Sequence, residues 1–209
     1  MPEHSPAQKQ YLLRVRRKKY MIHVSRILLF LGFLFLWEVS ARRRWIDSFI
    51  FSSPSEIWQT FFTMIQDQSL FTHIGITLAE TLISFVFTVL LGISAAVLLW
   101  VCPRLSHVLE PYLVVLNSLP KSALAPLLIV WLGANIRTII VAGISVAIFG
   151  SIINLYTGFR EVDPEKQKLI RTLGGSKKDE LTKIVLPSSV PFILSVMKVN
   201  IGLCLVGVI

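Results

Sequence analysis

Three polar side chains stand inside apolar stretches of this sequence, where they can meet a solute. Glu80 lies in the second apolar run of the chain, and Asn117 and Lys121 flank Pro120 in the third run. Polar groups within a membrane are costly and often mark a transport path. Backbone freed by a proline beside a lysine is suited to meet an anionic solute. We treat Lys121, Asn117 and Glu80 as candidate substrate contacts, although Glu80 can equally be interfacial and Lys121 can serve the kink.

No residue pattern in the sequence predicts an enzyme. The nucleotide-binding patterns G-x-x-x-x-G-K-[ST] and G-x-G-x-x-G do not occur, and neither does a His/Cys cluster or a paired-carboxylate site. The two cysteines, Cys102 and Cys204, lack metal-ligand spacing. We therefore expect no catalytic residue and no metal site, no cofactor bound by this chain, and no ATP hydrolysis by the chain itself.

A polar segment, 160–187, lies between two apolar runs and carries the start and stop signals of two short helices. Asp163 is a good N-cap and is followed by proline, which suits the first helical position. Gly174, followed by a second glycine, supplies a left-handed stop. Ser176 opens the second helix in capping-box register, and we expect Pro187 to end it.

Each predicted helix of this segment has one apolar side. The apolar residues are Leu169, Ile170 and Leu173 in the first helix, and Leu181, Ile184 and Val185 in the second. Helices this short are marginal in water unless they pack against something. The partner is either the chain's own membrane spans or a cytosolic protein.

The composition predicts a membrane protein. Of 209 residues, 54% are hydrophobic and 16% are charged, whereas a soluble domain carries about a quarter charged residues. Apolar runs near the length of a bilayer span recur along the chain. The formal net charge of +9 is concentrated in the N-terminal arm and in 160–187, with no nucleic-acid motif nearby. We predict an all-α, polytopic helical bundle in the bacterial inner membrane, with basic residues that set its topology and no nucleic-acid partner.

Two regions divide the chain in this interpretation. Residues 1–21 form a basic cytoplasmic arm, and 22–209 form the transmembrane domain. Arg42 to Arg44 then fall on the outer side, which conflicts with the positive-inside tendency. About five spans are expected, at 22–41, 77–101, 108–132, 136–158 and 190–209.

Irregular features interrupt this arrangement. The third span holds Pro111, Pro120 and Pro126, so it must be kinked or broken. Ser53 opens an amphipathic helix that we expect to lie at the membrane interface. The sequence stops inside its last apolar run, from which we expect a C-terminally truncated chain.

The spacing within 160–187 resembles the EAA loop of binding-protein-dependent ABC importer permeases. That pattern is Glu-Ala-Ala, three residues, Gly, nine residues, Ile, any residue and Leu-Pro. The chain matches it at Gly174, Ile184, Leu186 and Pro187, whereas 168–170 read Lys-Leu-Ile. Three further segments resemble the sulfonate, taurine and nitrate branch, which also contains uptake systems for thiamine-related pyrimidines: 51–56, 119–127 and 131–133.

The resemblance implies a division of labour. A permease subunit of this family has six spans, pairs with a second permease subunit (here a homodimer), and works with cytosolic ATPase subunits and an outer solute-binding protein. The solute is small and anionic or heterocyclic. The residues implied to couple to the ATPase are Leu169, Ile170, Leu173, Gly174, Ile184, Leu186 and Pro187.

Two other functions remain open from the residues alone. One is a secondary transporter driven by an ion gradient, which needs inverted repeats with a broken span in each half. The other is a membrane scaffold or sensor whose loop docks a partner.

Overall fold

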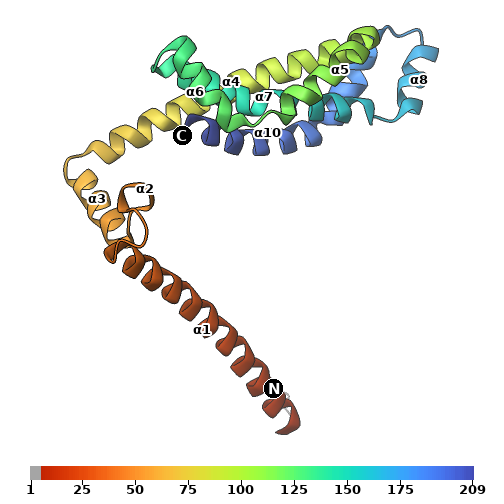
Figure 1. Cartoon of the computed structure of the whole chain (residues 1–209). Coiled ribbons are helices and arrows are strands. Elements are labelled where there is room, and N and C mark those ends of the chain that lie inside the picture. Colours follow the sequence, from red (N-terminus) through yellow and green to blue (C-terminus); the bar gives the residue numbers. More distant parts are fainter. Residues whose placement is uncertain (1–5) are drawn as a thin grey trace. The chain divides into compact units, whose positions relative to one another are not determined.

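The computed structural model describes residues 6–209, and all the regular structure in that range is helical (Figure 1). The predicted all-α class is confirmed. The first five residues of the basic arm predicted over 1–21 lie outside the described residues. The chain divides into two compact units, one ending at Phe71 and one running from Thr72 to Ile209.

The number of candidate membrane spans agrees with the prediction of about five. Within the described chain, four helices are long and apolar enough to cross a membrane, and a bent pair adds a fifth if it counts as one span. The four helices are Arg14–Arg42, Ser69–Val101, Ile136–Arg160 and Lys177–Val208, and the bent pair is Pro103–Ser118 with Ala123–Leu132.

The first unit consists of α1 (Pro6–Arg42), α2 (Ser48–Phe51) and α3 (Pro54–Gln66). Ser53 caps α3 as predicted, because its hydroxyl accepts a hydrogen bond from the amide of Glu56. Glu38 of α1 adds a second cap. Its carboxylate accepts hydrogen bonds from the Ser55 hydroxyl at 2.8 Å and the Ser55 amide at 3.1 Å. A carboxylate at the positive end of a helix is stabilising, so Glu38 joins α1 to α3.

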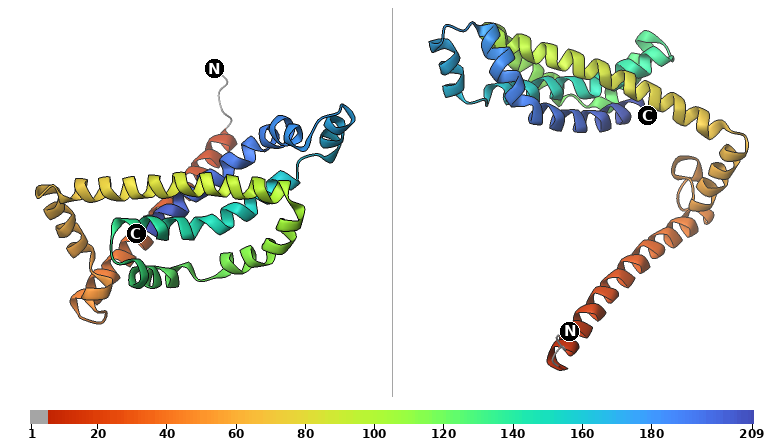
Figure 2. Two further views of the ribbon diagram at one scale, coloured as in Figure 1. Left: turned by 90° about the horizontal axis from the view of Figure 1, so that it is seen from above. Right: turned by 180° about the vertical axis from the view of Figure 1, so that it is seen from behind.

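The second unit is built around α7 (Ile136–Arg160). α7 packs along α10 (Leu186–Val208) and also contacts α5 (Pro103–Ser118) and α6 (Lys121–Leu132), as two further views show (Figure 2). Three buried hydroxyls mark the contacts of α7 and α10 with each other and with α4 (Ser69–Val101). Asn200 donates to Ser151 at 2.9 Å, Ser84 donates to the Ile140 carbonyl at 3.2 Å, and Thr88 lies 3.7 Å from the Cys204 sulfur.

The third span is broken, as predicted, but the break lies at Pro120 alone, and Pro111 and Pro126 lie inside α5 and α6. α5 ends at Ser118 and α6 begins at Lys121, and the two helices meet at an angle of 99°. Leu119 and Pro120 between them are extended, with ψ angles of 140° and 104°. The residue before a proline is pushed out of the helical region, and proline has no amide hydrogen to continue the ladder.

The prediction that Pro187 ends the second loop helix is wrong. α9 (Lys177–Glu180) runs through the π-helical turn η1 (Leu181–Val185) into α10 without a break. The Leu186 amide bonds to the Leu181 carbonyl, five residues back rather than four. This wider turn makes room for the proline ring, which otherwise clashes with the preceding turn.

The crossing of α7 and α10 depends on two facing glycines. A Cβ atom on Gly207 would lie 2.8 Å from the Cα atom of Gly143, whereas one on Gly202 of the same helix would meet nothing within 4 Å. Backbone cannot swing aside as a side chain can, and overpacking costs about 1–3 kcal/mol.

We expect Gly207→Ala to lower the thermal unfolding temperature in detergent. Gly202→Ala brings the same helix propensity without the contact and should leave it unchanged or raised; equal effects would contradict this crossing.

Candidate functional site

The polar segment 160–187 folds as a short capped helix joined to a long one. α8 (Pro164–Thr172) begins as predicted, because the Asp163 carboxylate accepts a hydrogen bond of 2.8 Å from the Glu165 amide. Gln167 holds this end of the helix, since its amide donates to the Val162 carbonyl at 3.1 Å. The sequence therefore predicted this helix start correctly.

The turn after α8 needs two glycines for two different reasons. Gly174 has a φ of +81°, the left-handed region, and a Cβ there would meet nothing within 4 Å. At Gly175 the limit is space, because a Cβ would lie 2.4 Å from Cγ2 of Ile170 and 2.9 Å from its carbonyl oxygen. Ile170 is thus half-buried under the turn. Gly174 permits the change of direction that the sequence predicted there.

The second half of the segment packs on the chain's own spans. Ser176 and Asp179 form the predicted capping box at the start of α9. Val185 is fully buried beside Phe159 of α7, and Ile184 and Leu186 pack against the same cluster. The partner for this apolar side is therefore the bundle, one of the two alternatives that the sequence left open.

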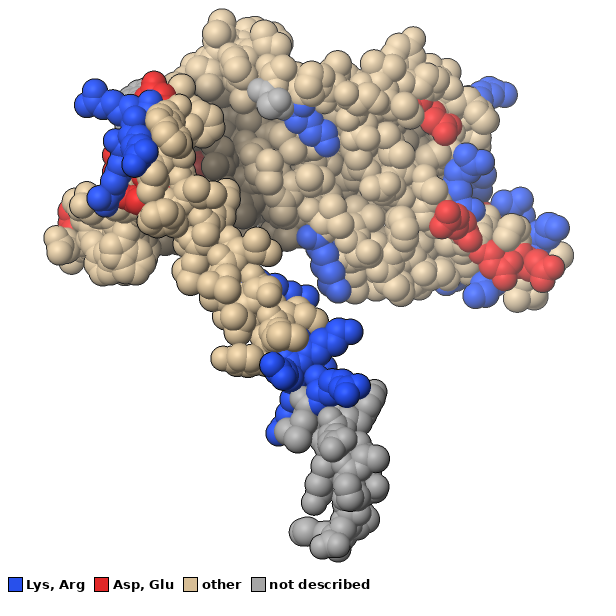
Figure 3. Space-filling view, turned by 60° about the horizontal axis from the view of Figure 1, so that its bottom comes forward, with Lys and Arg blue, Asp and Glu red and all other residues tan. Residues whose placement is uncertain are grey.

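The first half of the segment leaves its apolar side uncovered. Leu169 is 59% exposed and Leu173 is 76% exposed, and Lys168 beside them is exposed as well. Charged side chains gather at the end of the second unit that carries α8, while most of the visible face beyond it is uncharged (Figure 3). A short helix gains little stability by itself, and burial of these leucines against another surface would add to it.

An ion pair that the sequence does not predict joins the two halves. Arg171 of α8 binds the carboxylate of Glu180 through two nitrogens; Nε donates to Oε1, and Nη2 donates to Oε2 at 2.9 Å. The Glu180 side chain is 1% exposed and the Arg171 side chain 59%. Hydrogen bonding to Glu180 raises the pKa of the Arg171 guanidinium, so the arginine stays charged. A spacing of nine residues across a turn carries no periodic signal by which to find such a pair.

Of the three candidate solute contacts, Lys121 lies at a cavity. The cavity measures 290 Å³ and lies among α6, α7 and α10. Its lining is apolar apart from Lys121 and Ser145, and comprises Lys121, Ala125, Ala142, Ser145, Val146, Leu203, Val206, Gly207 and Ile209. Lys121 itself is half-buried at the first position of α6, next to the break.

The structure does not bring Asn117 and Glu80 into this cavity lining. Asn117 is half-buried on α5 near Gly150 of α7, where a Cβ would lie 3.2 Å from the Asn117 amide oxygen. Glu80 is 6% exposed on α4. The three candidates therefore stand on three different helices of the second unit.

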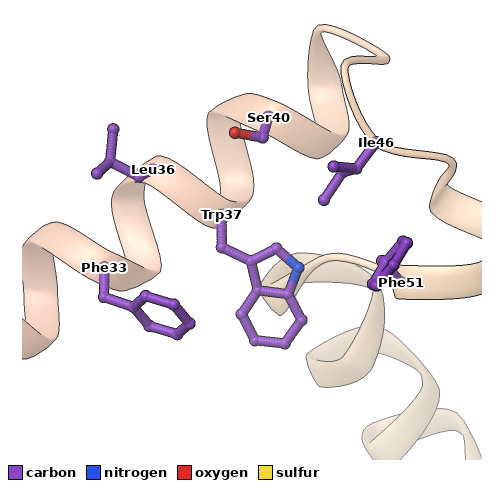
Figure 4. A pocket seen from close by; sticks show the side chains of 6 residues that line it. All are labelled: Phe33, Leu36, Trp37, Ser40, Ile46 and Phe51. Atoms are coloured by element: carbon purple, nitrogen blue, oxygen red, sulfur yellow. The ribbon is translucent and has the colours of Figure 1, made fainter.

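An apolar hollow in the first unit is a different kind of feature. It measures 390 Å³, and Figure 4 shows Trp37 of α1 between Phe33 and Phe51 in this hollow. Ser40 is the one hydroxyl-bearing side chain among its lining residues. This composition suits lipid contact at an interface better than recognition of a polar solute.

The chain thus has the architecture of a polytopic helical membrane protein, and comparison with known proteins agrees. The family described as binding-protein-dependent transport system inner membrane component matches residues 88–209. The formylaminopyrimidine transport permease protein ThiX of Halalkalibacterium halodurans is 28% identical over 181 residues, which cover 86% of this chain and 71% of that protein.

Two further relatives show the same level of similarity. The taurine transport system permease protein TauC of Escherichia coli is 24% identical over 201 residues, which cover 91% of this chain and 73% of the relative. The putative aliphatic sulfonates transport permease protein SsuC of Bacillus subtilis is 26% identical over 175 residues, which cover 83% and 63%.

The chain belongs to the family of binding-protein-dependent transport system inner membrane components. It is a multi-pass inner-membrane permease subunit of an ABC importer, in the branch that the sequence resembles, and its family is one of transport proteins rather than enzymes. This assignment favours the permease over the ion-driven transporter and over the scaffold or sensor.

Proposed function

We propose that α8 is the site at which a cytosolic ATPase subunit docks on this permease. The observation that carries the proposal is the uncovered surface of Lys168, Leu169 and Leu173, here called the docking face. Its helix is capped at the start and closed by a left-handed glycine, so it is formed before a partner arrives. An apolar pair beside a lysine fits a groove with apolar walls and an acidic rim.

In this proposal, separate proteins hydrolyse ATP, deliver the solute and complete the pathway. The ATPase hydrolyses ATP, an outer solute-binding protein delivers the solute, and a second copy of this permease completes the pathway. Support comes from the family, whose description names a binding-protein-dependent system. No nucleotide-binding pattern occurs in the chain that would give it this activity itself.

The N-terminus and the docking face belong on the cytoplasmic side in this proposal. Lys177, at the start of α9, donates to the Val101 carbonyl at the end of α4 at 3.1 Å, so the loop and the end of α4 share one side. With α1 and α4 crossing in turn, that side is also the side of the basic arm. Basic residues in both places agree with the positive-inside tendency.

Docking is tested by copurification with a matched pair of variants. We expect the chain, isolated intact from membranes, to bring down an ATPase, and Leu169→Asp to bring down at least about tenfold less. A leucine side chain that becomes buried on docking contributes about 1.5–3 kcal/mol to the binding free energy. Thr182→Asp adds the same charge at an exposed position outside the docking face and should retain the ATPase. If no ATPase copurifies with the intact chain and ATP depletion leaves uptake unchanged, the proposal is wrong.

The solute path in this proposal runs past Lys121. An ammonium group in a largely apolar cavity favours a negatively charged group on a small solute, and taurine and the aliphatic sulfonates, named for two relatives, both bear a sulfonate. We propose Asn117 of α5 and Glu80 of α4 as further polar contacts of the solute, outside the lining of this cavity. The solute is accordingly small and anionic or heterocyclic.

Uptake kinetics of Lys121 variants test this path. Taurine, an alkanesulfonate and formylaminopyrimidine are the probes, taken from the names of the relatives. For an anion, Lys121→Gln should raise the half-saturating concentration about tenfold to hundredfold, because a hydrogen bond to a charged group contributes about 1.5–3 kcal/mol. Lys121→Arg keeps the charge and should stay close to wild type. Unchanged kinetics in Lys121→Gln would remove Lys121 from the path.

A further inference from the structure

The loop contains a buried carboxylate whose partner lies on the other helix of the loop. Glu180 is 1% exposed at the end of α9, and both of its oxygens bind Arg171 of α8. A buried carboxylate without a partner is strongly unfavourable, whereas a paired one with two hydrogen bonds is tolerated. Among the described residues, Arg171 is the one cation that forms an ion pair with Glu180.

This ion pair is the link between two otherwise separate helices. Among residues 6–209, no other side-chain hydrogen bond or ion pair connects α8 with α9. Around the turn, the Gly174 amide bonds to the Arg171 carbonyl at 3.0 Å, the Gly175 amide bonds to the Ile170 carbonyl at 2.9 Å, and Ile170 lies against Gly175. These contacts lie within the turn itself, so the ion pair is the side-chain link that fixes the angle between α8 and α9.

The helix that carries Glu180 continues into a membrane span. α9 continues through η1 into α10 as one helix from Lys177 to Val208. At the start of this helix, the Lys177 ammonium donates a hydrogen bond to the carbonyl of Val101, the last residue of α4. Within η1, Val185 is fully buried among α4, α7 and α10. A displacement of α9 is therefore a displacement of α10, since a packed helix moves as a rigid element.

We propose that Arg171 and Glu180 are a positioning pair, which makes α8 and α9 one rigid body so that movement of the docked ATPase reaches α10 and α4. The inference rests on the proposed docking of an ATPase on α8. It adds a role for two residues that lie behind the docking face rather than on it. The Glu180 side chain is 1% exposed, so it offers almost no surface to a partner.

A purely structural role would predict a different result from a role in coupling. If the pair only helps the loop to fold, its loss weakens docking. If the pair transmits movement, docking and ATP hydrolysis persist while the response of the spans is lost. The measurement must therefore report on the spans and must not depend on knowing the solute.

The experiment uses the membrane complex of the permease and its ATPase, with Cys102 and Cys204 replaced and Ser145→Cys introduced as a reporter in the cavity. Trapping the ATPase with ATP and vanadate should change the labelling rate of Cys at position 145 by a thiol reagent by about fivefold or more, the lower end of coupling between sites. In Glu180→Gln, which keeps the shape of the side chain, we expect less than about twofold, with ATPase binding unchanged.

Two further variants sharpen the comparison. Arg171→Gln should behave like Glu180→Gln, whereas Arg171→Lys keeps a cation and should retain part of the response. Lys183→Gln removes the neighbouring exposed ion pair with Asp179, which measures 2.8 Å, and should leave the response as in wild type.

The outcomes separate this inference from the docking proposal. A wild-type response in both Glu180→Gln and Arg171→Gln overturns the positioning role. Loss of ATPase binding in Glu180→Gln also overturns it, because the pair then serves folding, while the docking proposal stands. A wild-type permease that binds no ATPase overturns the docking proposal itself, whereas a wild-type complex that holds its ATPase but does not respond to trapping overturns the positioning role.

Discussion

The close packing of α7 against α10 is the interaction on which the rest of the second unit depends. Gly143 and Gly207 let the two backbones approach at one end, and Asn200 bonds to Ser151 in the middle. In a bilayer, lipid tails are as apolar as leucine, so helices associate through small residues and hydrogen bonds rather than through the hydrophobic effect. The same two helices border the cavity at Lys121 and lead to the docking loop.

The loop continues this packed pair into water. Its second half belongs to the bundle, because Val185 is buried beside Phe159 and the helix runs on without a break. Its first half is a separate short helix, held to the second half by Arg171 and Glu180. The second half of the loop is thus an extension of α10, and the first half leaves Leu169 and Leu173 exposed.

Local signals made most of this loop predictable, and tertiary pairs did not. The starts at Asp163 and Ser176 and the turn at Gly174 follow from residues within one helical turn of each other, and the structure has all three. The break at Pro120 follows from the missing amide hydrogen. Pro187 does not end the helix as predicted, because the wider hydrogen bonding of the π-helical turn before it leaves room for the proline ring. The contacts of Glu38 with Ser55 and of Arg171 with Glu180 join separate helices at spacings without a periodic signal.

The central claim is that the exposed face of α8 contacts an ATPase in the membrane, and photo-crosslinking at position 169 tests it most directly. A benzophenone amino acid in place of Leu169, irradiated in intact membranes, should join the chain to a protein that carries the G-x-x-x-x-G-K-[ST] phosphate-binding pattern, as identified by mass spectrometry. The same probe at Thr182, outside the docking face, should give much less of that product. Crosslinks from position 169 to lipid or to the permease alone would contradict the account.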